Sequence, residues 1–409
     1  MSGKPAIGAL GAGRMGRGIA LVFAYAGHRC ILIDIKPREA VALEILRREA
    51  LAAIDGNLQA LEAAGVLDSK QRQAILGRIE FAGRAAAPAA LAAVDVLFEG
   101  VPERLDAKRE ACAFASGHAR PDAILASTTS TILSNDLAPF VTRPERFLNA
   151  HWLNPAFIIP LVELSPADAT APETVARMKA LLEGIGKVPV VCKPSPGFIV
   201  PRIQTLAMNE AARMVEEGVA SAEDIDKATR YGLGFRFAVL GVLEFIDWGG
   251  GDILYYASRY LTQATGQERY AAPPIIDRNM REGKLGLGSG KGFYDFEALD
   301  RDAYQRERLA RFVALLRHLD RQRTSLEHAA EIQEHDRQWQ SAVSLLTGGP
   351  VAGAFAFDAE GRLLDVGDRA AVLAAHPGAK RLDLGDATVV PGLIDAHGHV
   401  ANQIGRAHV

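Results

Sequence analysis

A histidine and a glutamate twelve residues apart could act together as a general base. His151 opens the sequence His-Trp-Leu-Asn-Pro, and Glu163 follows it in an apolar segment. A histidine that titrates near neutrality can accept a hydroxyl proton while a carbonyl forms, and a carboxylate behind it holds the tautomer and stabilises the imidazolium. The alternative is a structural histidine that follows an apolar stretch.

A run of hydroxyl side chains forms a second candidate site. It comprises Ser127, Thr128, Thr129, Ser130 and Thr131 at the end of an expected strand. Ligands of doubly wound sheets bind at the carboxyl ends of parallel strands, so these hydroxyls could bind substrate oxygens. The alternative is a polar loop in which Ser130 or Thr131 caps the next helix.

A glycine-rich turn lies between an expected strand at residues 6–10 and an expected helix at 18–26. Gly11 permits the tight turn, Gly13 lets the backbone approach a pyrophosphate, and Gly16 lets the helix pack closely on the sheet. Free N–H groups at the start of the helix can bind the phosphates. The full motif reads Gly11-Ala12-Gly13-Arg14-Met15-Gly16.

The second strand of this unit, residues 30–33, ends on Asp34. An acid at this position binds both hydroxyls of a ribose, and it disfavours NADP because a 2′-phosphate would face a carboxylate. Strand, glycines, helix, strand and acid together predict an NAD site rather than a structural turn. The position of His151 downstream of this unit favours the catalytic interpretation of the histidine.

Composition sets the class of protein. The chain has 409 residues, enough for two or three domains, with 49% hydrophobic and 23% charged residues and a net charge of −3. This charge gives no reason to expect nucleic acid or an anionic membrane as a partner. The sequence shows neither a signal peptide nor a transmembrane segment. Three scattered cysteines fit no metal spacing, so we predict a cytoplasmic protein without a metal centre.

Strand-length and helix-length segments alternate through the first half of the chain. This alternation predicts a doubly wound, mostly parallel α/β sheet with helices on both faces. Residues 36–80 are expected to be largely helical, with a break at 54–57. The further expected strands are 79–82, 94–99, 123–127, 161–164 and 188–192.

The pattern changes at residues 193–197, where two prolines and a glycine mark a boundary. The chain beyond this boundary is almost wholly helical, beginning with 199–217, which stops at Gly218. Ser221 with Asp224 resembles a capping box at the start of the next helix. A helical lobe beside a dinucleotide domain usually closes the substrate cleft and pairs subunits.

Together these motifs resemble the 3-hydroxyacyl-CoA dehydrogenase family over residues 6–296. The resemblance implies a Rossmann-type NAD-binding domain at 1–193, an all-helical substrate and dimerisation domain at 194–318, and a homodimer. The matching motifs are the glycine turn, Val101-Pro102-Glu103 with Lys108, the Ser-Thr run, His151-Trp152-Leu153-Asn154-Pro155, Leu161-Val162-Glu163, Pro196-Gly197-Phe198-Ile199-Val200 and Gly290-Lys291-Gly292-Phe293-Tyr294.

The resemblance also implies roles for single residues. His151 would be the general base, Glu163 its partner, and Ser130 a hydrogen-bond donor to the substrate oxygen. The implied reaction moves a hydride from C3 of a 3-hydroxyacyl-CoA, with the short-chain 3-hydroxybutyryl-CoA as the natural example, to NAD. The implied cofactor contacts are Gly11, Gly13, Arg14, Met15, Gly16, Asp34, Glu103, Lys108, Ser130 and Asn154.

Several positions depart from the family pattern. Pro201 replaces the usual asparagine after Gly-Phe-Ile-Val, although a proline suits the first turn of a helix. Thr128 replaces the asparagine of the serine loop, and Gly288 replaces a lysine that would contact the cofactor. These departures bear on the acyl-CoA substrate more than on the chemistry.

Residues 234–238, Gly-Phe-Arg-Phe-Ala, resemble the branch that contains lambda-crystallin and L-carnitine dehydrogenase. Those enzymes oxidise small 3-hydroxy acids such as L-gulonate or L-carnitine, which carry no CoA. Arg236 could pair with a substrate carboxylate, or it could form a salt bridge at a subunit interface. A third hypothesis is a non-catalytic NAD-binding protein, which the intact His151 and Glu163 pair argues against.

The family resemblance ends near residue 319. Residues 319–340 are expected to form a charged linker helix. Residues 341–402 resemble the truncated opening of a metal-dependent amidohydrolase and are expected to form an incomplete extension with short strands. His397 and His399 alone cannot complete a metal site, so we predict no amidohydrolase activity. Residues 403–409 resemble a translated sequencing adapter and are excluded from the fold as an artefact.

Overall fold

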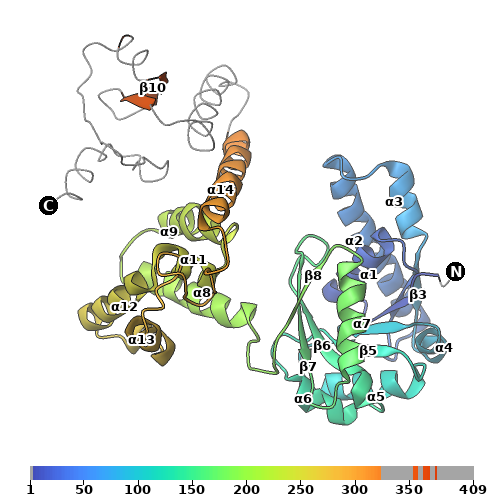
Figure 1. Ribbon diagram of the computed structural model, residues 1–409. Helices are drawn as coiled ribbons and strands as arrows, with labels where there is room; N and C mark the ends of the chain where they lie inside the picture. Colours follow the sequence, from blue (N-terminus) through green and yellow to red (C-terminus); the bar gives the residue numbers. More distant parts are fainter. Residues whose placement is uncertain (1–2, 324–352, 358–362, 369–373, 375–409) are drawn as a thin grey trace. The chain divides into compact units, whose positions relative to one another are not determined.

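The computed structural model describes residues 3–323, 353–357, 363–368 and 374. It divides into two compact units, Met1–Val219 and Ala220–Val409 (Figure 1). Most of the expected linker and amidohydrolase-like segment, and all of residues 403–409, lie outside the described residues. In the described part of the chain, no helix combines the length and the apolar composition needed to cross a bilayer.

The first unit is built on an eight-stranded sheet with the order β3-β2-β1-β4-β5-β6-β7-β8 (Figure 1). All neighbouring strands are parallel except β6 and β7, which confirms the predicted mostly parallel sheet. Strand β6 has no counterpart among the expected strands. The strands are β1 (Ile7–Leu10), β2 (Cys30–Ile33), β3 (Ile79–Ala82), β4 (Val96–Glu99), β5 (Ile124–Ser127), β6 (Phe147–Trp152), β7 (Leu161–Pro166) and β8 (Val188–Val191).

Helices cover both faces of this sheet (Figure 1). Helices α1, α2 and α7 contribute buried side chains to the core on one face, and α4, α5 and α6 do so on the other. Because both faces are covered, β1 and β2 are apolar throughout rather than alternating, whereas β4 and β5 are apolar up to a polar last residue, Glu99 or Ser127. The helices are α1 (Arg14–Tyr25), α2 (Ala40–Ala63), α3 (Ser69–Leu76), α4 (Ala87–Ala92), α5 (Leu105–His118), α6 (Ser134–Leu137), α7 (Pro172–Glu183) and α8 (Val200–Glu216).

Two helix boundaries differ from the expectation. Helix α2 runs unbroken through residues 54–57, so the predicted break is wrong. Ile54 and Leu58 lie one turn apart and are fully buried in the core. Their burial outweighs the poor helix propensity of Gly56, since packing stabilises most helices in proteins. Helix α1 begins at Arg14, inside the glycine motif and before the expected start at residue 18.

The second unit is helical, as predicted. Ser221 caps α9, because its Oγ accepts the backbone N–H of Asp224 at 3.1 Å. Helix α8 belongs to the first unit, and Gly218 beyond its end has a φ of 70°. The helices are α9 (Ala222–Ala228), a π-helix (Thr229–Gly234), α10 (Phe235–Phe237), α11 (Val242–Gly249), α12 (Gly251–Thr265), α13 (Pro274–Arg281) and α14 (Arg301–Arg323).

Beyond these helices the structure describes two short antiparallel strands, β9 (Gly353–Phe357) and β10 (Leu363–Asp368). They lie within residues 341–402, where the sequence predicts short strands. His397 and His399 lie outside the described residues.

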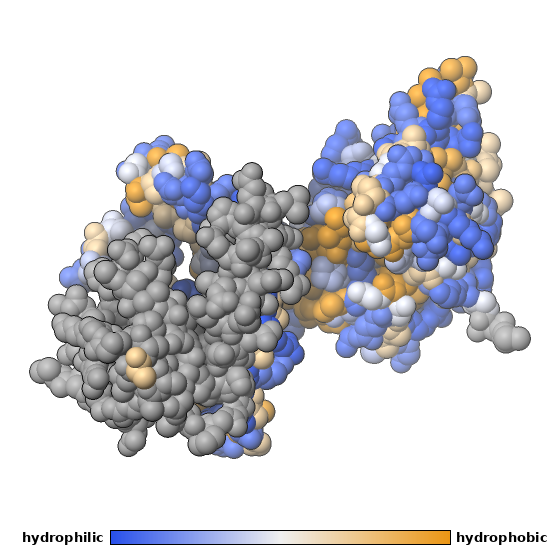
Figure 2. All heavy atoms as spheres, turned by 90° about the horizontal axis from the view of Figure 1, so that it is seen from above, coloured by the Kyte–Doolittle hydropathy of each residue, from blue (hydrophilic) through white to orange (hydrophobic). Residues whose placement is uncertain are grey.

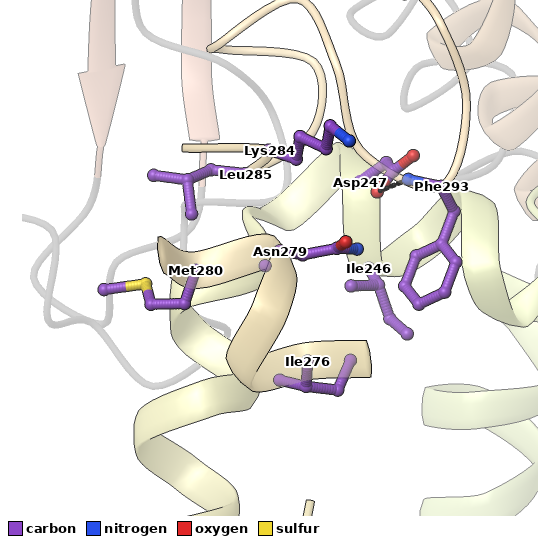
Figure 3. Close-up of a pocket in the computed structure, with 9 residues that line it drawn as sticks. Ile246, Asp247, Ile276, Asn279, Met280, Lys284, Leu285 and Phe293 are labelled. Carbon is purple, nitrogen blue, oxygen red and sulfur yellow. Dashed lines mark hydrogen bonds between the residues drawn. The ribbon is translucent and has the colours of Figure 1, made fainter. Parts of the chain in front are cut away.

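A buried aspartate holds the loop at residues 284–299 against α11. Asp247 is 2% exposed, and its carboxylate accepts the backbone N–H of Phe293 at 3.0 Å (Figure 3). It also accepts the backbone N–H of Tyr294 at 2.8 Å. A Cβ on Gly292 would lie 2.1 Å from Asp247 Oδ1. The Gly-Lys-Gly-Phe-Tyr motif therefore encodes a structural turn around this carboxylate.

This turn yields a stability prediction. Gly292→Ala should destabilise the second unit by about 1–3 kcal/mol, because the new methyl group overlaps a carboxylate that cannot move away from its two N–H donors. Gly288→Ala in the same loop is the control, since no atom lies within 4 Å of its Cβ position. The measurement is the midpoint of urea unfolding followed by circular dichroism. Equal midpoints for the two variants would contradict the prediction.

Candidate active site

His151 and Glu163 face each other across the antiparallel strands β6 and β7. They are register partners, and His151 Nδ1 lies 2.7 Å from Glu163 Oε2. Both are buried, with exposed fractions of 4% and 1%. Opposed residues of antiparallel strands project from the same face of a sheet. The twelve-residue spacing is thus that of two hairpin arms joined by a loop, and the structure brings the two predicted residues together.

The second carboxylate oxygen of Glu163 is bound by the start of helix α8. Oε1 accepts the N–H groups of Ile199 at 2.9 Å and Val200 at 2.8 Å. These donors are among the N–H groups that a helix leaves free at its N-terminus, where a negative charge is stabilised. One carboxylate therefore joins the histidine to the helix that comes after the proline-rich segment.

These contacts keep Glu163 ionised. Burial raises the pKa of Glu163, but the hydrogen bonds from His151, Val200 and Ile199 outweigh it, and the pKa lies below the ordinary value of 4.5. An ionised carboxylate only accepts hydrogen bonds, so His151 Nδ1 must carry the donated proton. In the neutral ring Nε2 is then the acceptor, the form that a general base requires.

Phe198 covers the histidine in a rarely populated backbone conformation. Its φ is 42°, its exposed fraction is 4%, and its ring centre lies 5.6 Å from that of His151. A non-glycine residue at positive φ costs about 1–3 kcal/mol and persists only where its surroundings impose it. Here Glu163 holds the next two N–H groups. The sequence signalled only the preceding Gly197, at φ 75°.

A row of buried polar side chains crosses the sheet one layer behind this pair. Glu99, Ser127, Asn149 and Ser165 are successive register partners on β4, β5, β6 and β7, and each is 0% exposed. Ser127 Oγ donates to Glu99 Oε2 at 2.6 Å, and Asn149 Nδ2 donates to the carbonyl of Thr129 at 3.2 Å. No sequence motif singled out this row, because it depends on the strand order.

Lys108 lies deeper than its expected cofactor role suggests. It is 1% exposed, and its Nζ lies 3.0 Å from Glu99 Oε1 and 3.5 Å from Glu103 Oε2. Glu99 also accepts the N–H of Val101 at 2.7 Å. The ammonium therefore anchors the segment after β4, and its contact with NAD stays a prediction.

Glu103 organises the Ser-Thr loop. Its Oε1 accepts the N–H groups of Ser130 and Thr131, each at 3.0 Å, and the Thr131 hydroxyl at 2.8 Å. Thr129 Oγ1 also donates to it. Burial raises the pKa of Glu103, but the bonds from Thr129 and Thr131 and the charge of Lys108 lower it further than burial raises it.

The same loop corrects the capping alternative. Helix α6 begins at Ser134, and its N-cap is Leu133, so neither Ser130 nor Thr131 caps it. Ser130 is exposed at the loop surface, and Thr128 is 7% exposed. The loop conformation comes from Glu103, which lies 26 to 28 residues away in sequence.

The glycine motif has the shape that a pyrophosphate needs. Gly11 has a φ of 104°, and a Cβ on Gly16 would lie 1.9 Å from the Gly11 carbonyl oxygen. At Gly13, by contrast, no atom lies within 4 Å of the Cβ position. Gly13 is the N-cap of α1, and no side chain caps the first N–H groups of this helix. Arg14 is exposed and Met15 is half-buried beside them.

Asp34 lies next to this turn. The N–H of Gly11 donates to the carbonyl of Ile33 at 2.8 Å, which brings the ends of β1 and β2 together. Asp34 is 5% exposed, and its Oδ2 accepts from Arg38 Nε at 2.5 Å. Asp34 was predicted from the sequence, but Arg38 was not. The only sequence signal for Arg38 is its spacing of four residues from Asp34.

Two predicted residues remain, Asn154 and Arg236. Asn154 is exposed in the loop between β6 and β7. Arg236 lies in α10 of the second unit, where its guanidinium is 5.3 Å from the ring centre of Phe245. Their roles stay predictions.

Comparison with known proteins identifies relatives of both parts of the chain. Residues 6–195 match the profile described as 3-hydroxyacyl-CoA dehydrogenase, NAD binding domain. Residues 197–296 match the profile of the C-terminal domain of the same family. The border between the two profiles falls at the segment that carries Phe198 and the Glu163 donors.

Three curated relatives cover most of the matched part. The 5-formyl-3-hydroxy-2-methylpyridine 4-carboxylate 5-dehydrogenase of Mesorhizobium japonicum is 31% identical over 77% of this chain and 98% of its own. The 3-hydroxybutyryl-CoA dehydrogenase of Bradyrhizobium diazoefficiens is 32% identical over 71% and 94%. Lambda-crystallin of Oryctolagus cuniculus is 35% identical over 61% and 76%.

The lowered pKa of Glu163 predicts a pH-dependent contribution to stability. Glu163→Gln should lower the free energy of unfolding by about 1–3 kcal/mol at neutral pH. The carboxylate's contribution is fully present above its unfolded pKa, ordinarily 4.5, and is lost as the pH falls through the lower folded pKa. The difference in the free energy of unfolding between wild type and variant should therefore shrink below about pH 4.5. Urea unfolding across this range measures it.

Glu183→Gln is the matched control. Glu183 is 53% exposed at the end of α7, and its carboxylate lies 3.8 Å from Lys179 Nζ. An exposed pair of this kind contributes less than about 1 kcal/mol. A Glu163→Gln difference that stayed constant with pH would refute the assigned charge state.

Proposed function

Because the chain belongs to the 3-hydroxyacyl-CoA dehydrogenase family, we propose that it oxidises a short-chain substrate such as 3-hydroxybutyryl-CoA, with His151 as general base. It is an NAD-dependent oxidoreductase that acts on CH–OH groups. The observation that carries the proposal is the buried 2.7 Å contact between His151 and an ionised Glu163.

The proposed chemistry divides between cofactor and protein. NAD, when bound, accepts the hydride that leaves C3. His151 Nε2 takes the proton of the 3-hydroxyl as the carbonyl forms, and Glu163 stabilises the resulting imidazolium. The pair is buried, so water screens their attraction weakly. The N–H groups at the start of α8 hold the Glu163 carboxylate in place throughout.

We assign the binding roles from the position of each residue. The backbone of the glycine motif, including Arg14 and Met15, binds the pyrophosphate, and Asp34 binds the ribose. Ser130 donates a hydrogen bond to the substrate oxygen from the loop that Glu103 organises. Lys108 acts on the cofactor through Glu103, because its ammonium is buried among carboxylates. Asn154 completes the cofactor contacts from the β6–β7 loop.

A free hydroxy acid is the second candidate substrate. The Mesorhizobium relative is named for a pyridine carboxylate without CoA, and it aligns with 77% of this chain. Pro201 lies in the first turn of α8, where the family pattern has an asparagine. Arg236 would then bind the carboxylate of an acid such as L-gulonate or L-carnitine.

Turnover assays on the full chain test the base. We expect NAD-dependent oxidation of 3-hydroxybutyryl-CoA, and a loss of about 10²–10⁴-fold in kcat for His151→Gln. His118→Gln is the control, because this exposed histidine lies on α5 and bonds to the carbonyl of Phe114. NADH formation is followed by absorbance, and L-gulonate and L-carnitine are tested separately as alternative substrates.

Each outcome of this assay separates the hypotheses. Turnover of a free acid alone would replace the acyl-CoA substrate with the second candidate. A His151→Gln variant with full turnover would remove the proposed base. Absence of turnover with all three compounds would favour the non-catalytic NAD-binding protein.

We further propose that the chain forms a homodimer through its helical part. Several large apolar side chains are exposed along each of the helices α8 and α12. Such groups of exposed apolar side chains mark interaction surfaces, whereas single scattered ones do not. In the view of Figure 2, hydrophobic patches interrupt a mostly hydrophilic described surface. The exposed residues on these helices are Ile203, Leu206, Met208, Val215, Ile253, Tyr256, Tyr260 and Leu261.

The oligomeric state is measured by light scattering after size exclusion. We expect twice the chain mass of 43.8 kDa for wild type and the monomer mass for the double substitution Leu206→Glu and Ile253→Glu. Val41→Glu is the control, because Val41 is 72% exposed on α2. A monomeric wild type would exclude the dimer.

A further inference from the structure

Arg38 forms an ion pair with Asp34, the acid that we assign to the ribose. Asp34 ends β2 beside the glycine turn, and Arg38 Nε lies 2.5 Å from its Oδ2. The side chain of Arg38 is 30% exposed and that of Asp34 is 7% exposed. Among the hydrogen bonds of the described residues, Arg38 takes Oδ2 and leaves Oδ1 for a ribose hydroxyl.

We propose that Arg38 is a ligand for a 2′-phosphate, so that the Asp34–Arg38 pair sets the selectivity of this site between NAD and NADP. A carboxylate alone at this position repels the 2′-phosphate, whereas a nearby arginine accommodates it. Here the two side chains neutralise each other. The site therefore rejects NADP much less strongly than Asp34 alone would.

The charges around the pair support this role. Lys36 is exposed two residues after Asp34, and Arg84 donates through Nη1 to the carbonyl of Ile35. Residues 34–39 carry Lys36 and Arg38 beside Asp34 and Glu39, and Arg84 adds a positive charge at Ile35. An excess of positive charge attracts a phosphate, and the planar guanidinium of Arg38 can bind two of its oxygens at once.

Removing Arg38, Asp34 or both should affect NAD and NADP binding differently. Without Arg38, the unpaired carboxylate would face the 2′-phosphate, and NADP should bind less well while NAD keeps its ribose contact. Without the Asp34 carboxylate, Arg38 is released to the phosphate, and the preference should reverse. Without both, the gain for NADP should disappear, because no guanidinium replaces the lost repulsion.

Dissociation constants for NADH and NADPH, measured on the full chain by fluorescence, test the proposal without any substrate. We expect Arg38→Ala to weaken NADPH about tenfold or more and NADH less than about threefold. Asp34→Ser should strengthen NADPH and weaken NADH, each about tenfold. The double variant should bind NADPH more weakly than Asp34→Ser does.

Arg47→Ala is the matched control. Arg47 also pairs with an acid, Glu44, at 2.7 Å, but on the exposed side of α2. It should change neither constant. A second readout is ionic strength, since salt should weaken NADPH binding less in Arg38→Ala than in wild type.

Two results would overturn the proposal. One is an Arg38→Ala variant that weakens both nucleotides equally, which would make Arg38 a positioning residue for Asp34 alone. The other is an Asp34→Ser variant that gains no affinity for NADPH. Arg38→Gln, which keeps a polar side chain, repeats the test if the alanine variant unfolds at a lower temperature. Because the readout is nucleotide binding, it stands apart from the proposed substrate and base.

Discussion

The site depends on the hydrogen bonds that the carboxylate of Glu163 accepts. One oxygen binds His151 Nδ1, and the other accepts two N–H groups at the start of α8. These partners come from β6 and from the segment after the proline-rich boundary, and this side chain hydrogen-bonds to both. The charge that orients His151, the proposed general base, is thus the charge that the helix N-terminus stabilises. Catalytic geometry and the placement of α8 are therefore one constraint.

A second carboxylate performs the corresponding task on the nucleotide side. Glu99 accepts hydrogen bonds from Lys108, from Ser127 and from the backbone N–H of Val101. The side chains of Glu99, Lys108 and Ser127 are all buried. Glu103, a few residues later, holds the Ser-Thr loop by four hydrogen bonds. Two residues predicted to lie along the cofactor, Glu103 and Lys108, thus hold neighbouring segments of the protein in place. Buried hydrogen bonds of this kind hold their members in place, which suits a site that must position a hydride donor.

Local patterns determined much of this architecture. The glycine turn, the acid after the second strand, and the alternation of strand and helix predicted the nucleotide unit, since each depends on neighbours within about thirty residues. The pairing of His151 with Glu163 was predicted from the two residue types and their short separation, although β6, one arm of the hairpin, was not among the expected strands. The helical character of the second unit was predictable from its apolar periodicity. The break in α2 was mispredicted because a glycine signal is local, whereas burial of Ile54 and Leu58 is not.

Only the tertiary structure decided which residues hold the site together. Glu163 meets its helix donors across 36 and 37 residues, and the polar row from Glu99 to Ser165 exists only because four strands adopt one order and register. The positive φ of Phe198 arises from contacts on both of its sides, which no single-residue preference encodes. The sequence by itself determined the kinds of chemical group and the elements that carry them. Their partners were decided by strand order and packing, because contacts between distant segments leave no periodic signal along the chain.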